Sequence, residues 1–120
     1  MNIVDLNTKI FSTTSDLRLE IENYIKENSK FKVGDVVDST LSNNGQYFVI
    51  SKLGFNNEII YYGNKVIKSS GEVSSMSMDS DIGTPEKCLN KTTLKIKGKE
   101  LSFIEESKYF TDKIRINIHI

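Results

Sequence analysis

The strongest constraint on the fold of this 120-residue chain is the stretch 31–68, where short β-branched and aromatic runs alternate with turn residues. Asn43-Asn44-Gly45 separates the run 36–41 from the run 46–53, and Asn-Gly accepts the left-handed backbone angles of a tight hairpin. Gly63-Asn64 offers a second turn of the same kind. The stretch therefore predicts the core strands of an antiparallel sheet. The predicted turns are at residues 34–35, 43–45, 54–57 and 63–64.

Residues 13–28 are predicted to form an amphipathic helix. The side-chain oxygens of residues 13–16 can accept hydrogen bonds from the first exposed amides. Four apolar side chains then recur at helical spacing: Leu17, Ile21, Tyr24 and Ile25. Residues 17–22 also alternate as a half-buried strand would, but the alternation stops at Asn23, and leucine, glutamate and lysine favour helix. We therefore expect a helix whose apolar face covers the sheet.

The composition changes after residue 68, where Ser, Gly, Asp and Met replace the aliphatic residues. The segment 69–90 is predicted to be a polar loop with a short helix, in which Thr84 is the cap and Pro85 occupies the first helical position. Loops longer than about 12–15 residues are uncommon in compact domains and are often functional. We therefore expect a binding site in its first part, residues 69–83.

Residues 91–120 return to strand patterns. Within 92–104, apolar residues alternate with polar ones on both sides of a predicted Gly98-Lys99 turn, which indicates a second hairpin. The tail 113–120 alternates with period two, so its isoleucines should face the core: Ile114, Ile116, Ile118 and Ile120. A strand with so much apolar surface must pair with its own sheet or with another copy of the chain, so a homo-oligomer through this strand is a further expectation.

The segment Phe31-Lys32-Val33-Gly34-Asp35-Val36-Val37, followed by Gln46-Tyr47-Phe48-Val49-Ile50, resembles the opening of SH3-like small barrels. These include phage and bacterial accessory proteins that begin F-x-V-G-D-x-V. The resemblance implies a small barrel, and it implies binding of proteins or nucleic acids in grooves between loops without naming a binding residue here. Together with the helix, it predicts one α+β domain over residues 1–120. In that domain a single N-terminal amphipathic helix packs on a strongly bent antiparallel sheet or small SH3-like barrel of about six strands.

Composition excludes several classes of protein. Sixteen basic and sixteen acidic residues cancel, which removes the overall attraction to phosphate expected of a dedicated nucleic-acid binder. The single cysteine, Cys88, cannot form a disulfide within the chain and suits a reducing compartment. No apolar run reaches the roughly 18 residues needed to cross a bilayer. We therefore expect a cytoplasmic protein that does not enter a membrane.

The sequence contains no recognisable catalytic or metal-binding set. Cys88 is the only thiol and His119 the only histidine, and a small enzyme that uses either is an alternative for which no third orienting group can be named. Asp79-Ser80-Asp81 is similar to the start of a calcium loop, but the ligands that should follow are wrongly spaced. Glycine-rich phosphate loops are absent. We therefore predict a non-enzymatic protein with no cofactor and no metal.

The leading functional hypothesis is a binding module that recognises a protein partner. The expected contact surface is the 69–83 loop, an aromatic edge, or both. Its candidate residues are the loop methionines Met76 and Met78 and the aromatic residues Phe55, Tyr61 and Tyr62. The alternative is weak nucleic-acid binding through a lysine run in which the last three members would share one face of a strand. The run consists of Lys91, Lys95, Lys97 and Lys99.

Overall fold

The computed structural model describes residues 14–40, 46–78 and 83–116. In this part of the chain one α-helix, nine β-strands and one 3₁₀ helix form an α+β structure, as predicted, with more and shorter strands than expected. The elements are α2 (Thr14–Asn28), β1 (Val36–Ser39), β2 (Tyr47–Phe55), β3 (Ile59–Val66), β4 (Val73–Ser77), β5 (Thr84–Pro85), η1 (Glu86–Cys88), β6 (Leu89–Lys91), β7 (Leu94–Ile96), β8 (Lys99–Leu101) and β9 (Arg115–Ile116).

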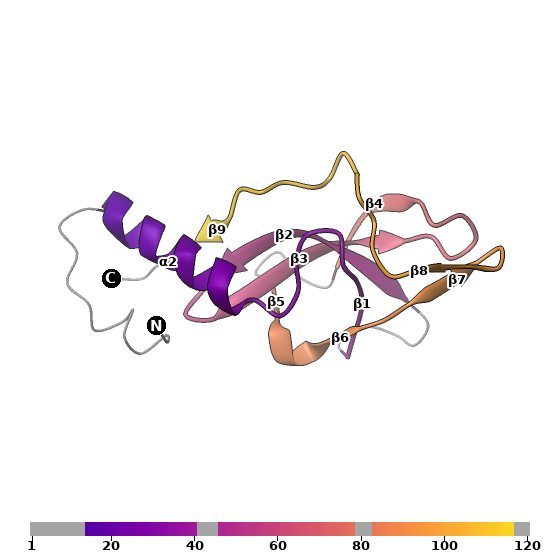
Figure 1. Cartoon of the computed structure of the whole chain (residues 1–120), viewed down its shortest axis with the longest axis horizontal. Helices are drawn as coiled ribbons and strands as arrows, with labels where there is room; N and C mark the ends of the chain where they lie inside the picture. Colours follow the sequence, from indigo (N-terminus) through magenta and orange to yellow (C-terminus); the bar gives the residue numbers. More distant parts are fainter. Residues whose placement is uncertain (1–13, 41–45, 79–82, 117–120) are drawn as a thin grey trace.

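Helix α2 confirms the predicted amphipathic helix. Leu17, Ile21 and Ile25 are buried, so the apolar stripe faces the sheet. Beside this stripe, the Arg18 guanidinium donates to the Ile114 carbonyl at 3.0 Å and forms an ion pair with Glu22. These contacts join α2 to the segment before β9, and Figure 1 shows the two close together at one end of the molecule. In the described residues there is no helix with the length and apolar character required to span a membrane.

The main sheet contains seven strands. β4, β3, β2, β1 and β6 are successive neighbours, all antiparallel, while β5 pairs with β3. β9 pairs with β2 in the parallel direction. The second sheet is the β7–β8 hairpin, which lies at the end of the molecule opposite α2 (Figure 1). In the part of the chain that is described, neither sheet closes on itself.

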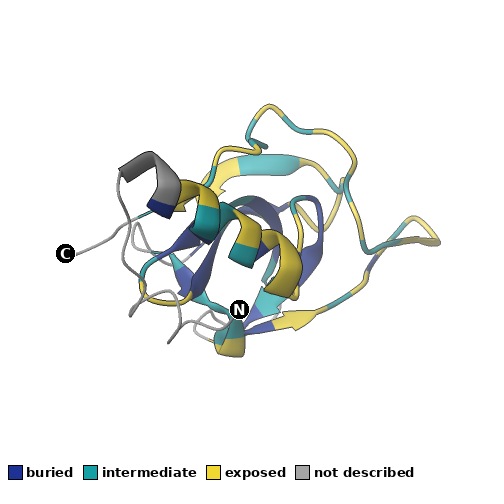
Figure 2. Ribbon diagram, turned by 60° about the vertical axis from the view of Figure 1, so that its left-hand side comes forward, coloured by how far each residue is buried: buried dark blue, intermediate teal, exposed yellow. Residues whose placement is uncertain are grey.

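Strand β2 is buried on both faces because its alternate residues enter two apolar clusters. Phe48 and Ile50 belong to the first cluster, under α2, while Val49 belongs to the second, beside the β7–β8 hairpin. The first cluster contains Leu17, Ile21, Ile25, Phe31, Val37, Phe48, Ile50, Phe55, Ile59, Tyr61, Met78 and Leu89. The second contains Val49, Val66 and Leu94, with Tyr47, Val73, Ile96, Leu101, Ile104 and Phe110 packed against them. In Figure 2 the buried ribbon follows the central strands, while the outer side of α2 and the hairpin are exposed.

The turn predicted at Gly63-Asn64 is wrong, because both residues lie inside β3. Gly63 is opposite Ile50, and a Cβ atom built on it would approach the Val49 carbonyl oxygen to 2.7 Å. The glycine therefore permits close strand packing rather than a turn. The chain turns from β2 into β3 at residues 56–58, only partly within the predicted 54–57 connection. The turn expected at 43–45 lies outside the described residues, although the strands on either side of it are antiparallel neighbours.

Residues 69–90 contain more regular structure than a polar loop. β4 adds to the edge of β3, where an exposed strand needs no apolar pattern because only its backbone must be paired. Thr84 is buried in β5 opposite Tyr61 and does not cap a helix, while Pro85 is the N-cap of η1 and not its first residue. The short helix itself is confirmed as a single 3₁₀ turn.

The hairpin predicted within 92–104 is confirmed as β7 and β8. Its turn is at Lys97-Gly98 rather than Gly98-Lys99, and both turn residues have positive φ.

The predicted C-terminal strand begins as β9, and Ile114 and Ile116 pack against the first cluster. Its parallel pairing with β2 was not predicted, since period-two alternation does not distinguish parallel from antiparallel neighbours. Residues 117–120, which include Ile118 and Ile120, lie outside the described part of the chain.

Candidate functional site

The five candidates for partner contact divide between the core and the surface. Phe55, Tyr61 and Met78 are buried in the first cluster, so their side chains stabilise the fold and do not face a partner. Tyr62 is half-buried, and Met76 is 59% exposed. A surface for a partner must therefore be built around Met76 from residues that the sequence did not single out.

Met76 borders a shallow hollow on the surface beside β3 and β4. The residues that line it, called here the edge patch, are Gln46, Lys65, Ile67, Lys68, Ser69, Ser74 and Met76. Ile67 and Met76 are two of four large apolar side chains that are exposed in the described residues. Lys65 and Lys68 are the charged members of the patch, and the Lys68 ammonium lies 5.5 Å from the centroid of the Tyr47 ring. The edge patch therefore combines apolar surface with positive charge.

β4 is an open border of the main sheet. Within the described chain no strand pairs with its outer side, and its sequence Val-Ser-Ser-Met-Ser contains neither a charged residue nor a proline. β6, at the opposite border, includes Lys91 and follows Lys87. Proteins commonly protect edge strands with lysine, proline or bulges, and only an irregularity in the pairing with β3 serves this purpose at β4. β4 is therefore the less protected of the two borders.

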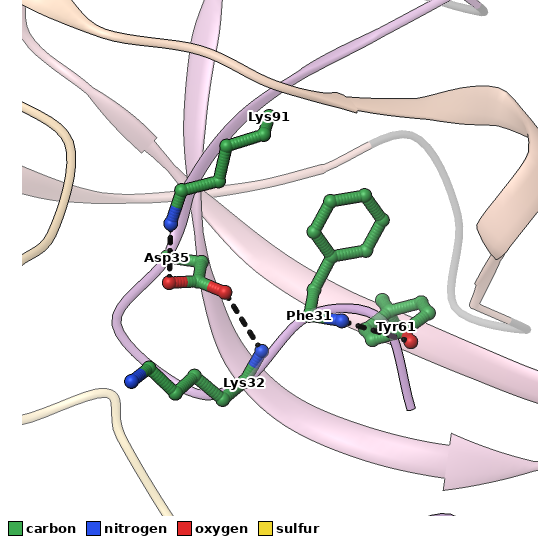
Figure 3. A network of polar contacts seen from close by, with 5 residues as sticks. All are labelled: Phe31, Lys32, Asp35, Tyr61 and Lys91. Carbon is green, nitrogen blue, oxygen red and sulfur yellow. Dashed lines mark hydrogen bonds and ion pairs between the residues drawn. The ribbon is translucent and has the colours of Figure 1, made fainter. Parts of the chain in front are cut away.

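The F-x-V-G-D segment is explained by contacts within the fold (Figure 3). The buried Asp35 carboxylate accepts from the Lys32 backbone N–H at 2.9 Å, and its other oxygen lies 2.6 Å from the Lys91 ammonium. These two interactions close the turn and join it to β6. The pattern thus has a structural role that requires no ligand.

Tyr61 joins three segments through one buried hydroxyl. The backbone N–H groups of Lys30 and Phe31 donate to this oxygen at 3.1 and 3.3 Å, and the hydroxyl donates to Glu86 Oε1 at 2.6 Å. Burial, followed by the hydrogen bond to Glu86 and its negative charge, raises the pKa of Tyr61 well above its ordinary value. The hydroxyl therefore stays protonated and holds the end of α2 onto β3 and η1.

Lys91→Met is expected to lower the free energy of unfolding by about 1–3 kcal/mol, because it removes the ion pair of the buried Asp35 carboxylate and leaves the hydrogen bond from the Lys32 N–H. The effect is limited because half of the Lys91 side chain is in contact with water, which screens the ion pair. Urea unfolding followed by circular dichroism measures the change.

Lys87→Met is the matched control for this change, since Lys87 is exposed nearby on η1. It should alter stability by less than about 0.5 kcal/mol. Equal losses in the two variants would mean that the Asp35–Lys91 contact contributes nothing specific.

The lysine run does not form the continuous face that nucleic-acid binding would need. Lys91 is paired with Asp35, and Lys95 is opposite Glu100 in the β7–β8 hairpin. Lys97 lies in the turn with φ of 50°, and Lys99 is opposite Ile96, so Lys95 and Lys99 lie on opposite faces of the hairpin. The expected ladder of three lysines is therefore wrong.

Cys88 is half-buried at the end of η1, and its carbonyl accepts from the Thr40 N–H at 2.9 Å. His119 lies outside the described residues, so the proposed pair with Cys88 is not described either. Among the described side chains, no group of three or more His, Cys, Asp or Glu residues could hold a metal ion.

No family model, curated protein or solved structure matches this chain. Contacts, burial and charge are therefore the basis of the functional proposals that follow.

Two cations that sequence reasoning missed lie near the ring of Tyr62. Lys52 is its cross-strand partner in β2, and Arg115 is on β9. Lys65 and Ile67 of the edge patch lie on either side of Val66, the last residue of β3, so strand alternation could have indicated that they share a face. No local signal indicates Arg115, because a parallel pairing brings it to β2 from far along the chain.

Proposed function

We propose that this protein is a non-enzymatic binding module that takes up an extended segment of a protein partner along β4. The observation that carries the proposal is the open, uncharged edge of β4 beside exposed Met76. An extended segment can pair its backbone with such an edge and so add a strand to the sheet. Main-chain hydrogen bonds then supply affinity, and the side chains on alternate positions supply specificity.

The edge patch defines the chemistry of the partner. Ile67 and Met76 offer contact to one large apolar side chain of the segment, and methionine adapts its shape to different partners. Lys65 and Lys68 favour carboxylates next to that side chain. Glu72 is also close, since its carbonyl accepts from the Ile67 N–H, but the two lysines outnumber it. The expected partner segment is therefore extended, with one apolar anchor flanked by acidic residues.

The resemblance of residues 31–37 to SH3-like small barrels supports the general part of this proposal, that the protein binds another molecule. Members of that family recognise proteins or nucleic acids in grooves between loops. The site proposed here is instead a strand edge, so no contact residue is transferred from the family.

A random peptide library selected against the full chain is expected to yield extended sequences with one large apolar residue beside carboxylates. Met76→Glu should weaken binding of a selected peptide by at least about tenfold, because it removes the central apolar contact and repels the acidic residues. Fluorescence anisotropy of the labelled peptide measures the affinity. Hydrogen exchange of the β4 amides should slow in the complex.

Leu19→Glu is the matched control, because Leu19 is 58% exposed, close to the 59% of Met76, and lies on α2 away from the patch. This variant should bind the peptide as tightly as the unmodified protein. Enrichment of no common sequence, equal weakening by both variants, or unchanged β4 exchange would each contradict the proposed site.

A further inference from the structure

A second site lies at an irregularity in β2. The register of β2 with β3 shifts between Ile50 and Lys52, and at this point the Thr111 N–H donates to the Ser51 carbonyl at 3.0 Å. The segment between β8 and β9, which runs along the sheet in Figure 1, is thereby attached to β2. A pocket of about 250 Å³ remains at this junction, and its walls include Ser51, Lys52, Tyr62, Tyr109, Thr111 and Arg115.

The pocket is organised around the ring of Tyr62. A Cβ atom on Gly54 would lie 2.7 Å from this ring, so the ring occupies the space that a side chain at residue 54 would fill. The Lys52 ammonium is 4.6 Å from the ring centroid, and the Arg115 guanidinium carbon is 5.6 Å from it. Lys52 in β2 is the cross-strand neighbour of Tyr62 in β3. Arg115 in β9 is the cross-strand neighbour of Gly54 in β2. The sheet register thus holds two cations at one aromatic ring.

The pocket carries positive charge and many hydrogen-bonding groups. Among the described residues that line it, Lys52 and Arg115 are charged and none is acidic. Ser51, Tyr109 and Thr111 also line it. The Ser51 hydroxyl donates to the Tyr62 carbonyl at 3.3 Å, while the Thr111 hydroxyl accepts from the Lys113 N–H at 3.2 Å and keeps its own proton to donate. The Tyr62 hydroxyl is buried and has no hydrogen-bond partner within the described chain, which is unfavourable until a ligand oxygen or water reaches it.

We infer that this pocket binds a small phosphate monoester. Two cations match the two negative charges of a phosphate monoester near neutral pH, and arginine, lysine and hydroxyl groups are the donors that phosphate oxygens accept from. The volume is slightly below the roughly 300 Å³ at which pockets for drug-sized ligands begin, which favours a compact molecule. No residue lines both this pocket and the edge patch, although Ser77 at the end of β4 lines the pocket. Substitutions at Lys52 and Arg115 therefore test the pocket without changing a residue of the edge patch.

Isothermal titration of the full chain with glycerol 3-phosphate is the direct test, with inorganic phosphate as the second probe and glycerol as the uncharged control. Saturable binding of glycerol 3-phosphate, weaker binding of phosphate and no binding of glycerol are expected. The affinity should fall below about pH 6, where the monoester takes up its second proton while lysine and arginine keep their charges.

Lys52→Met and Arg115→Met should each weaken binding by about tenfold or more, because each removes a charge-assisted contact and keeps an apolar stem. Lys65→Met is the matched control, since Lys65 is also a half-buried lysine of the main sheet but lines the other site. It lowers the net charge equally and should bind as the unmodified protein does. Unchanged thermal unfolding midpoints establish that each variant is folded.

Absence of glycerol 3-phosphate binding in the folded protein would overturn the inference. Equal weakening by Lys52→Met and Lys65→Met would overturn it as well, since it would indicate general attraction of anions to the surface. Weakening confined to Lys52→Met and Arg115→Met, with peptide binding at β4 unchanged, would support it.

Discussion

Gly34→Ala should lower the free energy of unfolding by about 3–5 kcal/mol. Gly34 has φ of 101°, a conformation that residues with a side chain rarely adopt. A Cβ atom would also lie 2.5 Å from the Ile104 carbonyl oxygen and 2.6 Å from the Phe103 ring. The carbonyl cannot move easily, because the Ile104 N–H donates to the Gly34 carbonyl at 2.8 Å. Strain and steric overlap therefore add, and urea unfolding measures the sum.

Gly98→Ala separates these two contributions. Gly98 also has a positive φ, of 81°, but a Cβ atom there would meet no atom within 4 Å. The expected loss is about 1–2 kcal/mol from backbone strain alone. If Gly34→Ala were no more destabilising than Gly98→Ala, this would contradict the steric overlap expected between a Cβ atom at residue 34 and residues 103 and 104.

Tyr61→Phe should lower the free energy of unfolding at neutral pH by about 1–3 kcal/mol. The variant keeps the ring, which packs edge-on against Phe31 with centroids 5.3 Å apart, and removes only the hydroxyl. The buried Phe31 N–H then loses the Tyr61 oxygen as its acceptor, while the Lys30 N–H keeps its bond to Glu86 Oε1 at 2.8 Å. The loss is measured by chemical denaturation against the unmodified protein.

Ionisation of Tyr61 should lower the free energy of unfolding at high pH. Because burial and Glu86 raise the pKa of Tyr61 in the folded state, the unfolded chain releases this proton first as the pH rises. The stabilising contribution of the protonated Tyr61 is complete below pH 10, which is about the pKa of tyrosine in the unfolded chain. Above that pH the free energy of unfolding falls by up to about 1.4 kcal/mol per pH unit. Tyr61→Phe should remove this part of the slope.

Glu86→Gln is the matched variant for the alkaline prediction. It keeps an oxygen that can accept from the Tyr61 hydroxyl and removes the negative charge, so part of the slope should remain. Identical slopes above pH 10 in the unmodified protein and in Tyr61→Phe would contradict the role assigned to the buried hydroxyl.

Local patterns predicted the elements whose partners are near in sequence or whose burial has a clear period. The helical spacing of Leu17, Ile21 and Ile25 identified α2, and the alternation around Gly98 identified the β7–β8 hairpin. The binding site was less accessible to such reasoning. Met76 and Met78 were selected as large apolar residues in a polar segment, but Met78 is buried. Phe55 and Tyr61 were selected as members of an aromatic edge and are also buried.

Periodicity and turn residues act within a few positions, so they were enough to establish the class of the fold, one amphipathic helix on an antiparallel sheet. Three features became evident only in the folded chain: Gly63 lies within a strand, the serine-rich β4 is the open edge, and Arg115 lies near Tyr62. In each case the deciding interaction joins backbone segments distant in the chain, and a backbone hydrogen bond leaves no side-chain pattern in either segment.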